Sequence, residues 1–240
     1  TKAIIPVHIF GQPADMISII KVAKQYKLKV IEDCAQSFGA KIKSKMTGTF
    51  GNFGCFSFFP TKNLGTAGDG GMMVTDNQSY YNKALKLRNH GGLKRNIHNY
   101  LGYNSRLDEI QAAILNIKMK YITMFNKKRN MIADYYKKSI QNTEIITPQL
   151  VKDNYNVFHQ YTIRVKNRKR FMGYLEKHSI PFGIYYPKPL YMQKAFNGII
   201  KIKKLPNVEK ICKECISLPM YPELNNKSIE YISSIINKYK

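Results

Sequence analysis

The sequence is short of acidic residues, of cysteines and of long apolar runs. Asp and Glu together number 15 against 39 Lys and Arg, which gives a formal net charge of +24. No run of about 18 apolar residues is present, so the sequence predicts no membrane-spanning helix. The opening residues, TKAIIPVHIF, lack the basic start and apolar core of a signal peptide. We therefore expect a cytoplasmic protein, and because the chain lacks an initiator Met we expect it to begin inside a domain.

Cysteine is scarce as well. Four cysteines in 240 residues do not make a disulfide framework. Cys212 and Cys215 form a CxxC pair, but no second pair and no nearby histidine completes a zinc site. We interpret the pair as two small residues on one helix, and we expect no metal.

The excess of basic residues raises nucleic acid and anionic membrane as partner classes. The lysines are spread along the whole chain, without a block of consecutive basic residues and without an aromatic and basic ladder. This distribution favours a solvated, lysine-rich surface over a nucleic-acid or membrane partner. The same field could steer an anionic substrate.

The first part of the chain alternates between strand and helix patterns. A β-rich run, AIIPVHIF, is followed by the helical spacing of QPADMISIIKVAKQYKLK and by the apolar run VIEDCA. This order predicts a βαβ unit, which builds parallel sheets covered by helices. Two more buried strands are predicted in GCFSFF and GGMMVT, and a helix from about Ser79 that is capped by Gly91 and Gly92.

Helical periodicity dominates the middle of the chain. From Ser105 to Ile140 apolar residues recur at helical spacing almost without interruption, which predicts one long helix bridging two parts of the protein. Ser105 with Asp108 or Glu109 resembles an N-terminal cap. A strand in VFHQYTIRV and helices in RKRFMGYLEKHS and SIEYISSIINKYK follow.

Three polar residues stand at or just beyond predicted strand ends. Asp33 ends VIED, and Ser57 and Lys62 follow GCF along the next strand. Ligands of open α/β sheets bind at the carboxyl ends of strands. From these residues alone, a salt bridge between Asp33 and Lys62 without chemistry is favoured. The following GTAGDGG is not a G-x-G-x-x-G motif, so no dinucleotide site is predicted, and its glycines are expected to allow a tight turn with positive φ where needed.

The chain resembles the DegT/DnrJ/EryC1/StrS family of sugar aminotransferases in four segments that occur in the right order: IIPVHIFGQPADM, VIEDCAQSFGA, FSFFPTKNLGTAGDGGMMVT and GYNSRLDEIQAAIL. The resemblance continues through QYTIRV, GIYYPKPLYMQKAF and SLPMYPEL. It implies the α/β fold of aspartate-aminotransferase-like, PLP-dependent transferases. Residues 1–118 would then be the remainder of the PLP-binding large domain, with a mainly parallel sheet. Residues 119–240 would be the bridging helix and a smaller C-terminal α/β domain.

The resemblance also assigns roles to the residues at the strand ends. Lys62 matches the lysine that holds pyridoxal 5′-phosphate (PLP) as a Schiff base and then moves a proton, and a partly desolvated lysine has the lowered pKa that this needs. A histidine there would suit the dehydratase branch, so Lys62 indicates transamination. Asp33 matches the acid that pairs with the pyridine nitrogen. Gln36 matches the residue that binds the ring oxygen, and Ser57 the hydroxyl that binds the phosphate.

Family enzymes are dimers with shared active sites, so the resemblance implies a homodimer. Asn104 matches the residue that reaches the partner's cofactor phosphate, and Arg106 would lie near the partner's anionic substrate. The alternative is that both residues cap and anchor the long helix. Tyr186 lies in the loop that borders the substrate pocket of the family and is a candidate substrate-binding residue. Tyr185 and Tyr191 stand where many relatives have histidines, so this loop differs from theirs at the border of the substrate pocket.

The implied function is amination of a nucleotide-linked keto-sugar, at the 3-keto position, with glutamate as donor, for polysaccharide or lipopolysaccharide synthesis. Relatives usually carry a further segment before TKAIIPVH, with a Gly-Thr pair that binds the phosphate and an aromatic residue that stacks on the ring. The chain is thus expected to be a fragment, one half of a split enzyme that needs an N-terminal partner, or a non-catalytic remnant.

Overall fold

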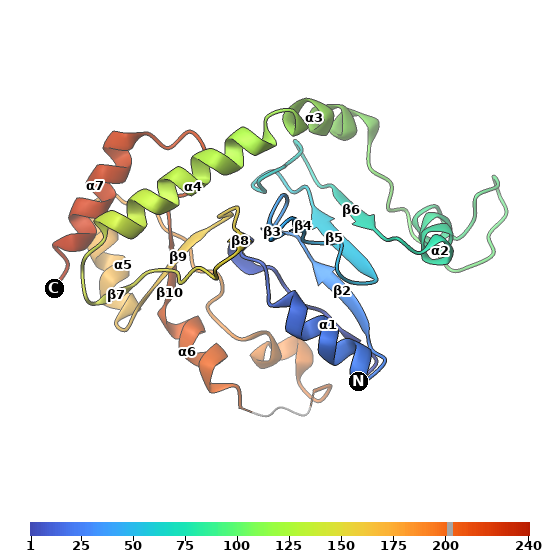
Figure 1. The fold of residues 1–240 in the computed structure, drawn as a ribbon, viewed down its shortest axis with the longest axis horizontal. Helices are drawn as coiled ribbons and strands as arrows, with labels where there is room; N and C mark the ends of the chain where they lie inside the picture. Colours follow the sequence, from blue (N-terminus) through green and yellow to red (C-terminus); the bar gives the residue numbers. More distant parts are fainter. Residues whose placement is uncertain (201–203) are drawn as a thin grey trace. The chain divides into compact units, whose positions relative to one another are not determined.

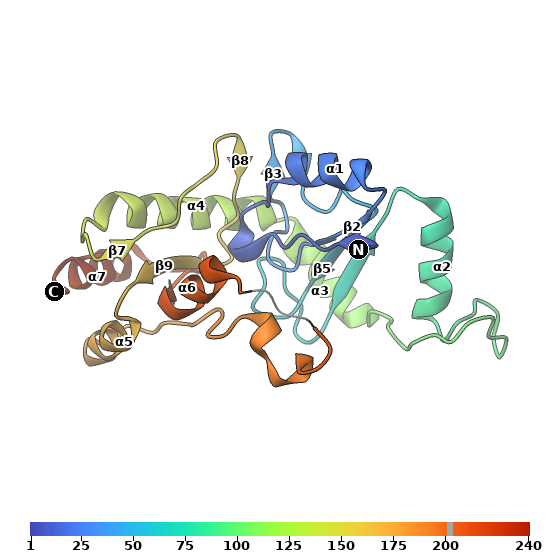
Figure 2. The same cartoon turned by 90° about the horizontal axis from the view of Figure 1, so that it is seen from below.

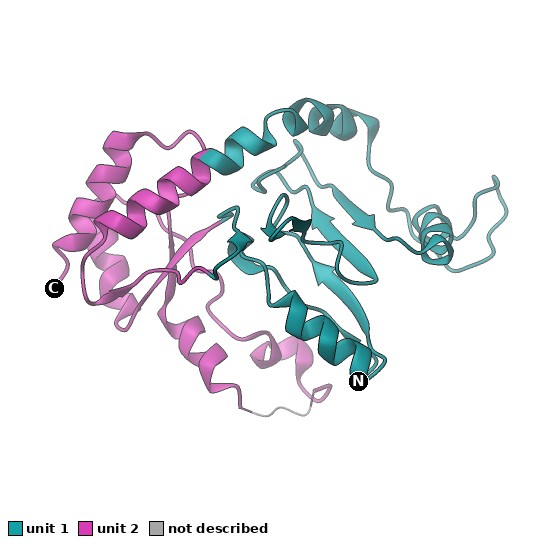
Figure 3. Ribbon diagram, in the orientation of Figure 1, with its two compact units in different colours: residues 1–127, 151–159 teal, residues 128–150, 160–240 magenta. Residues whose placement is uncertain are grey.

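The computed structural model describes residues 1–200 and 204–240, which form two compact units (Figures 1 and 3). Unit 1 comprises residues 1–127 and 151–159, and unit 2 comprises residues 128–150 and 160–240. Helix α4, Ile122–Ser139, contributes residues to both units. The predicted domain boundary after residue 118 stays a prediction.

Unit 1 is built on a four-stranded sheet in the order β1-β2-β5-β6. β1 (Ala3–Ile4) pairs in parallel with β2 (Lys29–Asp33), and β2 pairs in parallel with β5 (Phe53–Ser57). β6 (Gly71–Val74) runs antiparallel to β5. The predicted, mainly parallel sheet is confirmed. The prediction that β6 is a buried strand is wrong, because β6 lies at the edge of the sheet and its Met72 and Met73 are 41% and 49% exposed.

Helix α1, Met16–Gln25, lies alongside β2 (Figures 1 and 2). Asp15 caps its first turn by accepting a hydrogen bond from the Ser18 N–H. The buried face of the helix places Met16 and Ala23 against Val30 of β2. The predicted βαβ unit is therefore present, and burial of this apolar face fixes the helix on the sheet.

A second, antiparallel sheet in unit 1 joins segments far apart in sequence, in the order β4-β3-β8. β3 (Lys41–Ile42) pairs with β4 (Lys45–Met46) and with β8 (Asn154–Tyr155). A 3₁₀ turn, Ile9–Gly11, also meets this segment, because the Val157 N–H donates to the Gly11 carbonyl. Residues 151–159 thus belong to unit 1.

Helix α2, Gln78–Arg88, ends as predicted at a glycine. Gly91 has φ +84° and donates its N–H to the Lys86 carbonyl, which closes the last turn of the helix.

The predicted single long helix is wrong, because the structure holds two helices, α3 (Glu109–Met119) and α4. Between them the N–H groups of Lys120 and Tyr121 donate to carbonyls three residues back, a tighter pattern than the α-helix. The apolar spacing continues across this turn and so does not reveal it. The predicted Ser105 cap is also wrong, since its N–H donates to the Arg88 carbonyl and α3 begins after Asp108.

Unit 2 contains an antiparallel sheet in the order β10-β9-β7. Its strands are β7 (Ile145–Ile146), β9 (Tyr161–Val165) and β10 (Cys215–Leu218). Its helices are α5 (Arg168–Lys177), α6 (Pro206–Glu214) and α7 (Asn226–Asn237), with 3₁₀ turns at Leu190–Met192 and Lys194–Phe196. The predicted strand at β9 and the helices at α5 and α7 are confirmed.

The CxxC pair does not lie on one helix as predicted. Cys212 belongs to α6, whereas Cys215 is the first residue of β10. The helix and the strand follow one another without a loop, a junction that the sequence spacing does not mark. Among the described helices, none is long and apolar enough to cross a membrane.

Candidate active site

Two predicted site residues share the carboxyl edge of the parallel strands in unit 1. Asp33 is the last residue of β2 and lies opposite Cys55 of β5, and Ser57 is the last residue of β5. Both line a hollow of about 250 Å³, together with Ile5 and Ala35 among others. Because parallel neighbours end at the same edge of a sheet, the two side chains meet at one site.

The carboxylate of Asp33 is held at one oxygen. Its Oδ1 accepts the Ala35 N–H at 3.0 Å, and its backbone N–H donates to the Pro6 carbonyl at 2.9 Å. Oδ2 has no hydrogen-bond partner among the residues that the structure describes. Gln36 is oriented in a similar way, since its Oε1 accepts the Phe10 N–H at 2.6 Å, and its amide NH₂ has no hydrogen-bond partner within residues 1–200 and 204–240.

Lys62 lies in a closed loop just beyond β5. The Lys62 N–H donates to the Phe59 carbonyl at 2.9 Å, and Thr66 donates both its N–H and its hydroxyl to the Phe58 carbonyl. Ser57 joins this loop by accepting the Phe59 N–H at 3.3 Å. These bonds fix the turn on which the lysine stands.

The glycines after Lys62 serve by their small size. A Cβ on Gly65 would come within 2.6 Å of the Pro60 carbonyl oxygen. None of the glycines in GTAGDGG has a positive φ, so that expectation is wrong. At Gly65 a close backbone approach, and not the left-handed conformation, requires glycine.

Burial and charge act in opposite directions on Lys62. Partial burial lowers the pKa of its amine, and the negative charge of Asp33 acts to raise that pKa. The net direction is downward, which increases the fraction of free amine at neutral pH. The two residues form no ion pair in the described part of the chain, so the structure does not hold the salt bridge that the sequence alone favoured.

A buried pair that the sequence analysis did not single out lies behind Asp33. Glu32 and His8 are both fully buried, and His8 Nε2 contacts Glu32 Oε2 at 3.0 Å. The Gly48 N–H also donates to Oε2, and the Phe50 and Gly51 N–H groups donate to Oε1. The sequence feature that could have indicated this pair is Glu32, a charged residue at an inward-facing position of β2.

The hydrogen bonds define the tautomer of His8. Its Nδ1 accepts the Ala14 N–H at 3.0 Å, so Nε2 carries the hydrogen that is donated to Glu32. Cys34 lies close enough to complete a metal-like group with these two residues. The imidazole and carboxylate acceptors are already used by N–H groups, however, and burial raises the pKa of the Cys34 thiol to about 12. The group therefore fits a hydrogen-bonded core.

Asn104 and Arg106 lie away from the hollow, on the surface. Asn104 forms a β-bridge with Asn89, at the C-terminal end of α2. Arg106 donates to Asn89 Oδ1 at 3.0 Å and contacts His90 Nε2 at 3.1 Å. Arg106 is thus anchored to the end of α2 and not to the long helix, and the roles of both residues toward a partner subunit stay predictions. Tyr186 is exposed in unit 2, and its substrate role also stays a prediction.

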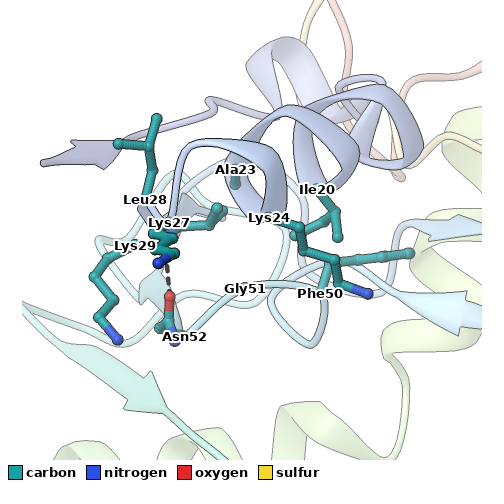
Figure 4. A pocket seen from close by; sticks show the side chains of 10 residues that line it. Ile20, Ala23, Lys24, Lys27, Leu28, Lys29, Phe50, Gly51 and Asn52 are labelled. Atoms are coloured by element: carbon teal, nitrogen blue, oxygen red, sulfur yellow. Dashed lines mark hydrogen bonds between the residues drawn. The ribbon is translucent and has the colours of Figure 1, made fainter. Parts of the chain in front are cut away.

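A larger hollow, of about 360 Å³, lies at the opposite end of β2 (Figure 4). The C-terminal turn of α1 and the start of β2 form it, and Asn52 accepts the Val30 N–H there. Its cations are Lys24, Lys27 and Lys29. Lysines at a helix C-terminus complement the helix dipole, so this hollow differs in chemistry from the site at Asp33.

Comparison with known proteins gives a consistent result. The DegT/DnrJ/EryC1/StrS aminotransferase family model matches residues 1–237. A pleiotropic regulatory protein of Geobacillus stearothermophilus is 43% identical, over 100% of this chain and 65% of that protein. A UDP-N-acetyl-3-dehydro-alpha-D-glucosamine 3-aminotransferase of Acidithiobacillus ferrooxidans is 43% identical, over 99% of this chain and 64% of its own length. The chain thus spans slightly less than two thirds of each relative.

Solved structures that resemble this chain are consistent with the family match. DesV of S. venezuelae, in complex with a ketimine intermediate, has a TM-score of 0.95 and 32% identity, over 99% of this chain and 65% of that one. NtdA of Bacillus subtilis, with bound cofactor PMP, has a TM-score of 0.88 and 31% identity, over 98% of this chain and 56% of that one. The expected fold, that of the PLP-dependent transferases, is confirmed.

Proposed function

The chain belongs to the DegT/DnrJ/EryC1/StrS aminotransferase family, and from this premise we propose that it acts as a PLP-dependent aminotransferase of nucleotide-linked keto-sugars. The observation that carries the proposal is Lys62, whose pKa is lowered by burial at the sheet edge where Asp33 and Ser57 line one hollow. An amine, a carboxylate and a hydroxyl are the groups that an aldehyde, a pyridine nitrogen and a phosphate require.

The residues present fit PLP by their chemistry. Asp33 offers Oδ2 to a protonated ring nitrogen, Gln36 offers its amide NH₂ to the ring oxygen, and Ser57 offers its hydroxyl to the phosphate. The PMP bound to the related NtdA supports this assignment. When bound, the cofactor supplies the electron-accepting ring of transamination.

The protein's own part in the reaction is to orient groups and to move a proton. Asp33 keeps the ring nitrogen protonated, because an ionised carboxylate stabilises the cation that it contacts. Lys62, as a free amine, would serve as the general base that takes the proton from the substrate carbon and would hold that proton for its return. Partial burial keeps water from competing for that amine.

The substrate proposed is a nucleoside-diphosphate-linked 3-keto sugar, with glutamate as amino donor. The name of the Acidithiobacillus ferrooxidans relative supports the 3-keto position and the UDP group. The net charge of +24 would attract such an anion. In a homodimer, Asn104 would reach the partner's cofactor phosphate and Arg106 would lie near the partner's substrate, and both residues are exposed.

The test is conversion of a UDP-linked 3-keto sugar to the amino sugar with PLP and glutamate, followed by mass spectrometry. Lys62→Ala should reduce the rate at least about 100-fold, because positioned proton transfer contributes that much. Lys169→Ala, on an exposed face of α5, serves as the control and should leave the rate unchanged. Equal rates for Lys62→Ala and the unchanged chain would refute the proposal.

The alternative is a non-catalytic remnant, or one half of an enzyme that needs a separate N-terminal partner. This alternative predicts no product from the chain alone with any amino donor. Product that appears only after an N-terminal piece of a relative is added would support the split enzyme.

A further inference from the structure

Asn63, the residue after Lys62, lies at the centre of a buried polar cluster in unit 1. Asn63, Asn126 and His159 are only 7%, 3% and 6% exposed. Asn63 Nδ2 donates to Asn126 Oδ1 and to the Val157 carbonyl, both at 2.8 Å. Its Oδ1 lies 3.2 Å from His159 Nδ1. Because the amide donates both hydrogens, Oδ1 accepts, and His159 therefore carries a hydrogen on Nδ1.

The cluster connects the lysine loop to distant parts of the chain. Asn126 belongs to α4, and Val157 and His159 belong to the segment that follows β8. Asn126 Nδ2 also donates to the Phe38 carbonyl at 3.1 Å. Phe38 is two residues after Gln36, so the same cluster ties together the segments that carry two proposed cofactor contacts.

Apolar packing holds the other side of the loop. Leu64 is buried in a cluster with Phe58 and Leu115. The two residues that follow Lys62 are therefore both fixed, one by hydrogen bonds and one by packing. A buried polar group that loses a hydrogen-bond partner costs free energy, so loss of the Asn63 side chain would destabilise the cluster.

We infer that Asn63 is a positioning residue, which holds the Lys62 amine in its half-buried place through its hydrogen bonds to Asn126, Val157 and His159. The role of that amine rests on the proposed function, but its place does not. If Asn63 is lost, the loop loosens and water reaches the amine. The pKa of Lys62 then rises toward that of an exposed lysine, because burial is what lowers it.

The test uses competitive labelling of the amines with acetic anhydride as a function of pH, without cofactor, quantified by mass spectrometry on the peptide that contains Lys62. The quantity compared is the labelling midpoint, the pH at which labelling of a lysine reaches half of its maximum. In the unchanged chain the labelling midpoint of Lys62 should lie below that of the exposed lysines in the same digest. Asn63→Leu should raise the labelling midpoint of Lys62 to that of the exposed lysines. Asn142 in unit 2 is a matched control, since it also donates to two carbonyls and accepts one N–H. Asn142→Leu should leave the Lys62 midpoint unchanged.

A second pair of variants covers the case in which Asn63→Leu does not fold. His159→Leu removes the donor to Asn63 Oδ1 and should raise the midpoint, whereas His159→Asn can place an amide N–H near the same position and should restore it. The inference is overturned if folded Asn63→Leu or His159→Leu chains keep the Lys62 midpoint, or if Asn142→Leu moves it equally. Failure of PLP to attach to the unchanged chain would count against the proposed function alone.

Discussion

At the scale of single residues, Asp33 and Lys62 influence each other electrostatically. The Asp33 carboxylate raises the pKa of Lys62 against the larger effect of burial. Asp33→Asn should therefore lower the labelling midpoint of Lys62 further, while the exposed Asp76→Asn should not change it. An unchanged midpoint in Asp33→Asn would mean that the two groups are electrostatically independent.

The buried His8–Glu32 pair predicts a large effect on stability. His8→Leu removes one donor from a fully buried carboxylate that keeps three backbone N–H donors, and it should lower the free energy of unfolding by about 1–3 kcal/mol. Urea unfolding followed by circular dichroism measures this, with exposed Asp69→Asn as a control that should stay within about 0.5 kcal/mol. A loss below about 1 kcal/mol for His8→Leu would contradict the hydrogen-bond assignment.

The same pair predicts the response to acid. Burial alone would raise the pKa of Glu32, but hydrogen bonds from His8 and from the Gly48, Gly51 and Phe50 N–H groups lower it below its ordinary value of 4.5. A carboxylate with a depressed folded-state pKa stabilises the fold above its unfolded pKa, and this contribution is lost as pH falls through the folded value. Stability should therefore decline below about pH 4.5. Glu32→Gln should be less stable at pH 7 and lose less stability on acidification; an equal loss would contradict the assignment.

At the scale of elements, two glycines give opposite predictions. A Cβ on Gly54 of β5 would overlap the backbone of Gly48, whereas a Cβ on Gly173 of α5 would meet nothing within 4 Å. Gly54→Ala should destabilise the protein by about 1–3 kcal/mol or more, through forced backbone shifts. Gly173→Ala should stabilise it by about 0.5–1 kcal/mol, because alanine favours the helix interior. Thermal unfolding of both variants checks the pair, and equal effects would contradict the close approach of β5 to residue 48.

The elements also show what could be predicted from sequence. The βαβ unit at the start follows from local patterns, because the apolar spacing of α1 and the short runs around it report burial directly. The break at Lys120 and Tyr121 does not, since the apolar spacing continues through it. The antiparallel direction of β6 depends on its neighbour β5. Contacts such as His8–Glu32, 24 residues apart, and Asn63–His159, 96 residues apart, arise only in the folded chain.

Some parts of the candidate site could also be predicted from the sequence, and others could not. Asp33, Ser57 and Lys62 could be placed from strand ends and from the family resemblance, because the ends of adjacent parallel strands share an edge. The closed loop around Lys62 and the buried polar cluster around Asn63 could not be predicted from the sequence. They depend on the close backbone approach at Gly65 and on contacts with α4 and with residues 157–159.

At the scale of the whole molecule, the net charge of +24 predicts attraction to any polyanion. Such binding depends on counterion release, so retention on duplex DNA should fall steeply with salt and should not differ between two unrelated sequences. Filter binding at several salt concentrations measures this. Salt-resistant preference for one sequence would favour a nucleic-acid function over the one proposed.

In the proposed function, Lys62 is the amine that binds the cofactor. Its most direct test is to mix the chain with PLP, reduce with borohydride and map the labelled peptide by mass spectrometry. We expect the label to be concentrated on the peptide with Lys62 at low PLP concentration, and to be lost in Lys62→Ala. Label spread evenly over surface lysines, and unchanged in Lys62→Ala, would contradict the claim.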